Sequence, residues 1–251
     1  MRRDVVWKDP EVVAAFVHET RGGVPYGADQ LAMMVRVIAA GGRPVGRFLD
    51  VGCGSGVVTA ALLARFPEAQ AVLVDFSDAM LAAARDALAG SDPPAVLIAG
   101  DLADATWLDV VRAQAPFDAI ASSYAIHHLT DARKRALYGE LYGLLAAGGT
   151  FVNVEHVASA GAWGEALSDA VMVDSLHADQ RSRGGAATRD EVAARFATRP
   201  DKAANILAPL ETQCAWLRDI GFTDVDCFFK VAELAVFGGR KPEPQPRIAR
   251  M

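Results

Sequence analysis

Three glycines, Gly52, Gly54 and Gly56, stand at alternate positions between a short apolar run and an alanine-rich run. A strand that turns through glycines into a helix brings bare backbone N–H groups close to a ligand. The spacing is GxGxG, whereas nicotinamide dinucleotide sites carry GxGxxG. The glycines alone therefore indicate only a nucleotide-like ligand.

Three acids extend this pattern. Asp50 lies beside the glycines, and Asp75 and Asp101 each follow a later apolar run. Asp75 follows Gly54 at about the 20-residue distance at which dinucleotide folds place a ribose-binding carboxylate. Since nothing nearby supplies positive charge for a pyrophosphate, we expect a ligand with free ribose hydroxyls and no pyrophosphate.

The apolar runs predict strands that alternate with helices. Runs ending near residues 51, 75, 100, 125 and 156 are typical of strands, and the segments between them have helical patterns. This rhythm predicts a doubly wound α/β fold, with a parallel sheet and helices on both faces. Ligands of such sheets bind at the carboxyl ends of the strands, where the three acids would meet.

The two ends of the chain depart from this rhythm. Helices from Pro10 and over 28–40 precede the sheet, and the turn between them either belongs to a flap over one sheet edge or closes the ligand cleft. Residues 159–219 show no clear strand pattern and predict helical insertions. Residues 224–231 and 233–237 must form an antiparallel hairpin, because a parallel crossover needs a dozen or more residues.

Composition limits the class of protein. The 251 residues are 52% hydrophobic with a net charge of −6, which predicts one globular domain without a broad nucleic-acid-binding face. We find no signal peptide and no apolar run of about 18 residues, so we expect a cytoplasmic protein that spans no membrane. Three cysteines without metal-ligand spacing fit reduced thiols.

With these acids in place, the chain resembles the class I S-adenosylmethionine-dependent methyltransferases, most closely their bacterial small-molecule branch. LDVGCGSG, VDFSDAML and SSYAIHHL carry the resemblance over residues 46–157, and GFTDVDCFFKVAELAVFGGRK fits the family's closing hairpin. The resemblance implies a Rossmann-like, seven-stranded sheet with an antiparallel last strand. It also implies one domain over 1–241, comprising an N-terminal helical flap (1–45), a cofactor-binding core (46–157), a helical insertion forming the acceptor pocket (158–219) and a closing hairpin (220–241), followed by a flexible tail (242–251).

The resemblance also implies S-adenosylmethionine as the cofactor. The glycine turn would pass under its methionine part, Asp50 would steer the amino group, and Ser123 would meet the methionine end.

The adenosine end has its own implied contacts. Asp75 would take the ribose hydroxyls and Phe76 would flank the adenine. Asp101 would accept from the adenine amine, and Leu102 would donate its backbone N–H. The plainer alternatives make Asp75 an acid near a helix N-terminus, Phe76 a core residue and Asp101 a turn residue.

Candidates for a general base are His127 and His128 after the fourth strand, and Glu155 and His156 after the fifth. A base is needed only where the nucleophile carries a proton of high pKa, because in-line positioning of an activated methyl supplies much of the rate. The HHL pattern is often structural in the family, so a structural role is the alternative for the histidine pair.

Tyr26, Arg21 and His177 are candidates for substrate binding. The first two lie in the N-terminal turn, and His177 lies in the insertion that usually builds the acceptor pocket. Exposed polar positions are the alternative for all three. A metal held by Glu155, His156 and His177 would follow no known ligand spacing, so we expect no metal site.

We expect methyl transfer to an oxygen, nitrogen or carbon nucleophile of a small-molecule acceptor. The motif of base-modifying nucleic-acid methyltransferases is absent where the fourth strand ends in SSYA. A second hypothesis is a carboxylated cofactor, whose extra carboxylate Arg21 and Tyr26 would bind. A third is a non-catalytic cofactor-binding protein. We expect a monomer or homodimer with no nucleic-acid or membrane partner.

Overall fold

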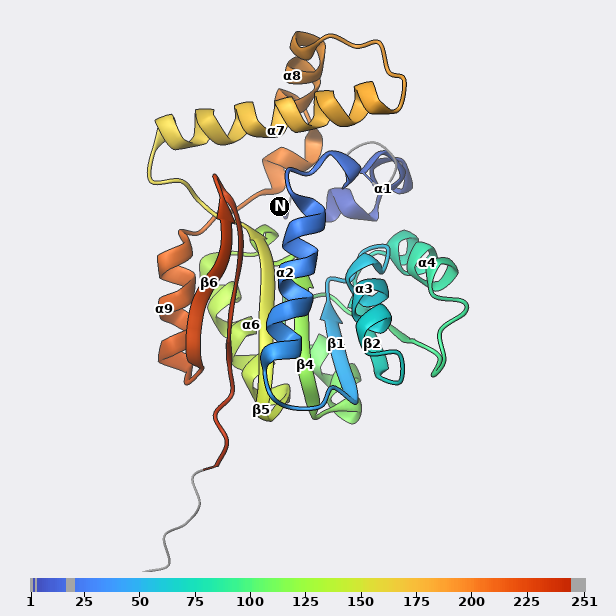
Figure 1. Cartoon of the computed structure of the whole chain (residues 1–251), viewed down its shortest axis with the longest axis vertical. Helices are drawn as coiled ribbons and strands as arrows, with labels where there is room; N and C mark the ends of the chain where they lie inside the picture. The colour runs from blue at the N-terminus through green and yellow to red at the C-terminus, as the bar shows by residue number, and fades with distance from the viewer. Residues whose placement is uncertain (1, 3, 17–20, 245–251) are drawn as a thin grey trace, which may run out of the picture.

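The computed structural model describes residues 2, 4–16 and 21–244, and its sheet has seven strands in the order β3-β2-β1-β4-β5-β7-β6 (Figure 1). The strands are β1 (Arg47–Val51), β2 (Gln70–Asp75), β3 (Val96–Ala99), β4 (Phe117–Ser123), β5 (Leu145–His156), β6 (Thr223–Val231) and β7 (Leu234–Arg240). β7 runs antiparallel to both of its neighbours, β5 and β6. This confirms the predicted seven-stranded sheet with an antiparallel last strand.

Helices cover both faces of the sheet. One layer holds α2 (Gly27–Ala40), α3 (Val57–Arg65) and α4 (Asp78–Ala87), and the other holds α5 (Trp107–Val111), α6 (Asp131–Leu144) and α9 (Leu210–Ile220). Alternate residues of a strand serve the two layers. In β2, Leu73 packs toward α3 and α4, and Val72 and Val74 pack toward the other layer.

The second N-terminal helix is part of a layer, not of a flap over the sheet edge. Met34 and Ile38 of α2 are buried against strand residues such as Phe48 and Val152. The segment before it, η1 (Asp4–Lys8) and α1 (Pro10–Ala15), lies over the carboxyl ends of the strands. Residues 17–20, where the first helix was expected to continue, lie outside the described residues, as does most of the expected tail.

The fifth strand includes Ala147, Gly148 and Gly149. α6 ends at Leu144, and β5 begins directly after it at Leu145. Pairing with β4 is irregular there, since Phe117 pairs with Leu145 while Ala119 pairs with Thr150. The glycines therefore lie in a bulge of the strand.

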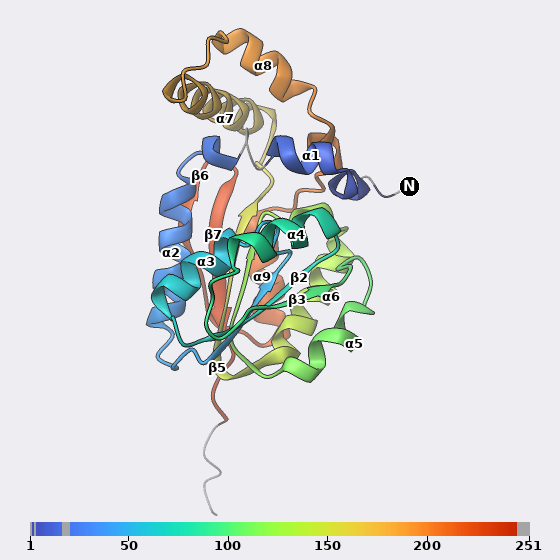
Figure 2. The ribbon, with the colours of Figure 1, turned by 90° about the vertical axis from the view of Figure 1, so that its right-hand side faces the viewer.

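The predicted insertion is helical. It contains α7 (Ala162–Ser182), α8 (Arg189–Ala197) and η6 (Pro200–Ala204), and Figures 1 and 2 both show α7 and α8 stacked beyond α1. The remaining short helices are η3 (Arg21–Gly23), η4 (Arg112–Gln114) and η5 (Ile126–His128). Within the described ranges, we find no helix with the length and apolar character that crossing a membrane requires.

Candidate active site

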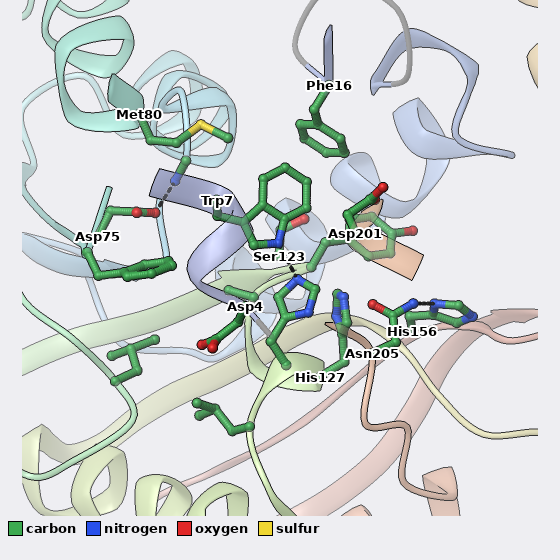
Figure 3. Close-up of a pocket in the computed structure, with 18 of the residues that line it drawn as sticks. Asp4, Trp7, Phe16, Asp75, Met80, Ser123, His127, His156, Asp201 and Asn205 are labelled. Atoms are coloured by element: carbon green, nitrogen blue, oxygen red, sulfur yellow. Dashed lines mark hydrogen bonds between the residues drawn. The ribbon is translucent and has the colours of Figure 1, made fainter. Parts of the chain in front are cut away.

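A cavity lies at the carboxyl ends of β1, β2, β4 and β5, beneath η1 and η6 (Figure 3). From the sheet side it is lined by most of the residues expected to bind cofactor, namely Gly52, Gly54, Asp75, Phe76, Asp101, Leu102 and Ser123. From the covering side it is lined by residues of the N-terminal segment and of the insertion, namely Arg2, Asp4, Trp7, Phe16, Met172, Phe196, Arg199, Asp201, Lys202 and Asn205. The fold thus encloses the predicted cofactor residues together with the insertion.

The glycine turn has a conformation that larger residues would disrupt. Gly52 has a φ of +65°, and a Cβ there would come within 2.2 Å of Ala125 Cβ. The Gly52 N–H donates to the Val74 carbonyl at 2.8 Å, which ties the turn to β2. Gly56, at φ +80°, precedes the first residue of α3. The turn is a bare backbone surface against which a ligand can lie closely.

Asp75 closes this turn from the next strand. Its two oxygens each accept one backbone N–H at 2.9 Å, from Gly54 and from Ser77. A carboxylate has about four acceptor positions, so both oxygens keep capacity for donors in the cavity. Burial raises the pKa of Asp75, and hydrogen bonds from the backbone of Ser77, Gly54 and Phe76 act against that rise. The remaining acceptor positions fit a pair of ribose hydroxyls, which donate.

Asp50 occupies a different place from the one expected. It is fully buried beneath the glycine turn, and its Oδ2 accepts from the Thr59 N–H at 3.1 Å and from Thr59 Oγ1 at 2.7 Å. Among the described residues, the cavity lining includes neither Asp50 nor Gly56. Asp50 therefore orients the start of α3, and direct contact with an amino group is not supported by its position.

Asp101 faces the cavity but already has a cationic partner. Arg2 Nη1 lies 2.7 Å from one carboxylate oxygen and Arg2 Nη2 lies 3.0 Å from the other. Partial burial raises the pKa of Asp101, but the Arg2 hydrogen bonds and the Ala103 N–H outweigh it, so its pKa lies below the usual value. The guanidinium also lies 5.9 Å from the centre of the Phe76 ring.

His127 and Glu155 form a buried dyad at the cavity wall. His127 Nδ1 lies 2.6 Å from Glu155 Oε1, and Glu155 also accepts from Asn153 Nδ2 and the His156 N–H. Glu155 is fully buried behind His127, which itself lines the cavity. Burial raises the pKa of Glu155 to about 7 and lowers that of His127. Of the four candidates for a general base, Glu155 is the one that another candidate, His127, separates from the cavity.

The other two histidines also line the cavity and are held differently. His128 Nε2 accepts from Trp7 Nε1 at 3.0 Å, and burial lowers the pKa of His128 to about 3. His156 Nε2 lies 2.9 Å from Glu233 Oε2, and Asn205 lies near its other nitrogen (Figure 3). His128 is thus a hydrogen-bond acceptor for the covering segment, and His156 forms a second histidine–carboxylate pair.

The substrate-binding candidates are not brought together. Tyr26 is 56% exposed, with its ring 6.3 Å from that of Phe229. Among the described residues lining the cavity, neither Tyr26 nor His177 is present. The side chain of Arg21 lies outside the described part of the chain. A group of three histidine, cysteine or acidic side chains able to hold a metal does not occur among the described residues.

Several cavity residues were not predicted. Arg2 and Trp7 belong to an N-terminal segment too short for a periodic pattern, and Arg199 and Asn205 lie at the end of the insertion. Glu233, which pairs with the cavity residue His156, was also not predicted: it is 5% exposed at the turn of the hairpin, where the sequence pattern made it the first residue of a strand.

Comparison with known proteins relates this chain to methyltransferases and to a synthase of a carboxylated S-adenosylmethionine. A family model described as a methyltransferase domain matches residues 48–149. The chain is 27% identical over 234 residues to a carboxy-S-adenosyl-L-methionine synthase of Chromohalobacter salexigens, a match covering 90% of this chain and 80% of that protein. It is 35% identical over 142 residues to a trans-aconitate 2-methyltransferase of Methylobacterium radiotolerans, covering 51% and 50% of the two chains.

A solved structure shares the architecture. An O-methyltransferase family protein from Burkholderia thailandensis matches with a TM-score of 0.58 at 18% identity, over 92% of this chain and 63% of that one. The chain thus spans less than two thirds of that solved protein. The strand order and the antiparallel strand belong to the same fold.

Proposed function

Because this chain belongs to the class I S-adenosylmethionine-dependent methyltransferases, we propose that it methylates a proton-bearing nucleophile of a small molecule and that His127 accepts the proton. S-adenosylmethionine is the cofactor, and when bound it supplies a methyl group already activated on a sulfonium. The His127–Glu155 dyad in the wall of the cavity is the observation that carries the proposal.

The residues that would hold the cofactor follow from the cavity geometry. Asp75 would accept the ribose hydroxyls, and Gly52 and Gly54 would lie against the methionine part. Phe76 and Asp101 would flank and accept from the adenine. These roles use the remaining acceptor positions of Asp75 and the bare backbone of the glycine turn, which lie next to one another in the cavity.

The dyad supports a base because Glu155 determines which ring nitrogen is protonated. When Glu155 is ionised, it accepts the Nδ1 proton, and His127 Nε2 is then the nitrogen with a lone pair. Proton removal from a hydroxyl or amine is what a base contributes once the methyl group is in line.

The covering elements support a small acceptor. Trp7 of η1 and Phe196 and Asn205 of the insertion close over the cavity, so an acceptor must fit between them and the sheet. We assign the acceptor pocket to this insertion. We also propose a cytoplasmic location, which is supported by the free thiols of all three cysteines.

The test uses the purified chain, S-adenosylhomocysteine and labelled S-adenosylmethionine with a panel of phenols, amines and thiols. We expect His127→Gln to lower turnover by about 100-fold or more while S-adenosylhomocysteine binding stays unchanged. His128→Gln, at the neighbouring position, is the matched control and should lower turnover much less. Wild-type turnover in His127→Gln would contradict the assignment of the base, and failure to bind S-adenosylhomocysteine would contradict the function.

A carboxylated cofactor is the second candidate, because the match to a carboxy-S-adenosyl-L-methionine synthase covers 90% of this chain. An extra carboxylate needs a cation, and Arg2, Arg199 and Lys202 in the cavity lining each have an acidic partner already. Mass spectrometry of the ligand that copurifies with the chain separates the two: we expect S-adenosylmethionine or S-adenosylhomocysteine, without the additional carboxylate mass.

A further inference from the structure

A second chamber lies beside the cavity, between α1, α7 and α8. Five residues line both spaces, namely Trp7, Phe16, Phe196, Arg199 and Asp201, so these side chains form the boundary between the two. Trp7 and Phe16 of this boundary meet edge to face with ring centres 5.0 Å apart (Figure 3). A ligand group that reaches past these rings from the cavity enters the chamber.

The chamber beyond the rings has aliphatic walls. Val12 and Ala15 of α1, Leu176 of α7 and Val192 of α8 line it. The wall formed by Leu176 is packed firmly from behind, since a Cβ at Gly23 would come within 2.7 Å of its Cδ2. An apolar group placed here would exchange water for aliphatic contacts.

The inner cations beside the chamber are paired with carboxylates, and the outer one, Arg195, bonds to an amide. Arg199 pairs with Asp201, and Lys202 pairs with Asp169 at 2.8 Å. Arg195, exposed at the outer side, donates to the Gln180 side-chain oxygen at 3.2 Å. A charged group entering the chamber would lose water and find the inner cations already paired, whereas an uncharged apolar group would not carry this cost.

We propose that this chamber receives an uncharged, apolar group of the methyl acceptor while the acceptor's nucleophile faces His127. The inference rests on the proposed function and defines its substrate class. The acceptor is a small amphipathic molecule with a proton-bearing nucleophile at one end and an alkyl or aryl group at the other.

The test measures binding of para-alkylphenols, from phenol to para-butylphenol, by calorimetry of the chain saturated with S-adenosylhomocysteine. We expect the dissociation constant to fall about three- to fourfold for each added methylene. We expect para-propylphenol to bind about tenfold more tightly than para-hydroxyphenylpropanoate, which has nearly the same shape and a negative charge.

Ala15→Phe should fill the chamber and abolish the gain with chain length. Ala14→Phe is the matched control, because Ala14 is the adjacent exposed residue of α1 and lines neither space among the described residues. Ala14→Phe should keep the wild-type series.

The outcomes separate this inference from the function on which it rests. A wild-type series without chain-length dependence, or tighter binding of the propanoate, overturns the inference even if the chain transfers methyl groups. Loss of the gain in affinity with chain length in both Ala15→Phe and Ala14→Phe also overturns the inference. Absence of S-adenosylhomocysteine binding overturns the proposed function instead.

Discussion

At the scale of the residue, Glu155 carries a titration that the proposed chemistry needs. Burial raises its pKa to about 7, and its partner atom is His127 Nδ1 at 2.6 Å. Below that pH the protonated carboxyl donates to Nδ1, so the single proton of the neutral ring resides on Nε2. Nε2 then has no lone pair with which to accept a proton from the nucleophile. Above it, Nε2 holds the lone pair. We expect turnover to rise with pH through about pH 7 and to level off above it.

Glu155→Gln checks this assignment. The amide cannot ionise, so the variant should lose the step near pH 7 and turn over about 100-fold more slowly at high pH. Glu233→Gln is its matched control, because Glu233 holds another cavity histidine, His156, in a similar pair. If the step persists in Glu155→Gln and disappears in Glu233→Gln, His156 is the base.

Asp75 provides a prediction for cofactor affinity. Asp75→Asn keeps one oxygen but places an amide nitrogen against a backbone N–H, and it removes the charge from the hydrogen bonds to the ribose. Since a hydrogen bond to a charged group contributes about 1.5–3 kcal/mol, we expect S-adenosylhomocysteine to bind about 10- to 100-fold more weakly by calorimetry. Asp78→Asn, three residues on and exposed, should bind normally. Equal affinities in the two variants would remove Asp75 from the site.

At the scale of the element, two side-chain contacts tie η1 and the residue before it to the sheet side of the cavity. Arg2 bonds to Asp101, and Trp7 bonds to His128. Asp101 keeps acceptor capacity beside Arg2, because Oδ2 accepts one hydrogen bond, from Arg2 Nη1 at 2.7 Å, and a carboxylate oxygen has two lone pairs. Arg2 can therefore stay bound to Asp101, and so hold η1 over the cavity, while Asp101 also accepts from an adenine amine.

We expect Arg2→Gln to speed release of S-adenosylhomocysteine by up to about fivefold, the most that an exposed ion pair of about 1 kcal/mol allows. Added salt should speed release from the wild type and have little further effect on the variant. Arg112→Gln, which removes an exposed pair far from the cavity, is the control. Stopped-flow fluorescence of Trp7 reports the release, and unchanged rates in Arg2→Gln would show that Arg2 does not hold η1 closed.

The sequence predicts those elements whose position depends on local pattern and sheet topology. Asp75 and Asp101 meet at one edge because strand order brings successive carboxyl ends together. Arg2 could not be placed, because its partner lies 99 residues away and nothing local marks it. His177 shows another limit. Met172 faces the cavity, whereas His177, five residues later, is rotated from it by about 140° around the helix axis. The sequence pattern predicts the helix but not which of its faces points toward the cavity, so it could not choose between the two residues.

At the scale of the whole molecule, the pKa shifts of Glu155 and His127 have opposite effects on how the free energy of unfolding changes with pH. Unfolded, Glu155 and His127 titrate near 4.5 and 6.5. Folded, Glu155 titrates near 7 and His127 well below its usual value. Between about pH 4.5 and 6.5 each state holds one proton on the pair, in the folded state on Glu155 and in the unfolded state on His127. Since stability changes with pH only where the two states bind different numbers of protons, the pair contributes little slope there.

Single substitutions should expose the two opposite slopes. In His127→Gln, buried Glu155 keeps a raised pKa, so the folded state binds more protons and the free energy of unfolding should fall as the pH rises from about 4.5 to 7. In Glu155→Gln, His127 stays neutral when folded, so the free energy of unfolding should instead fall as the pH drops below about 6.5. Urea denaturation across this range measures both, relative to the wild type. Parallel pH profiles in the two variants would mean that burial shifts the pKa of neither group, because each remaining group would then titrate in the fold as it does in the unfolded chain.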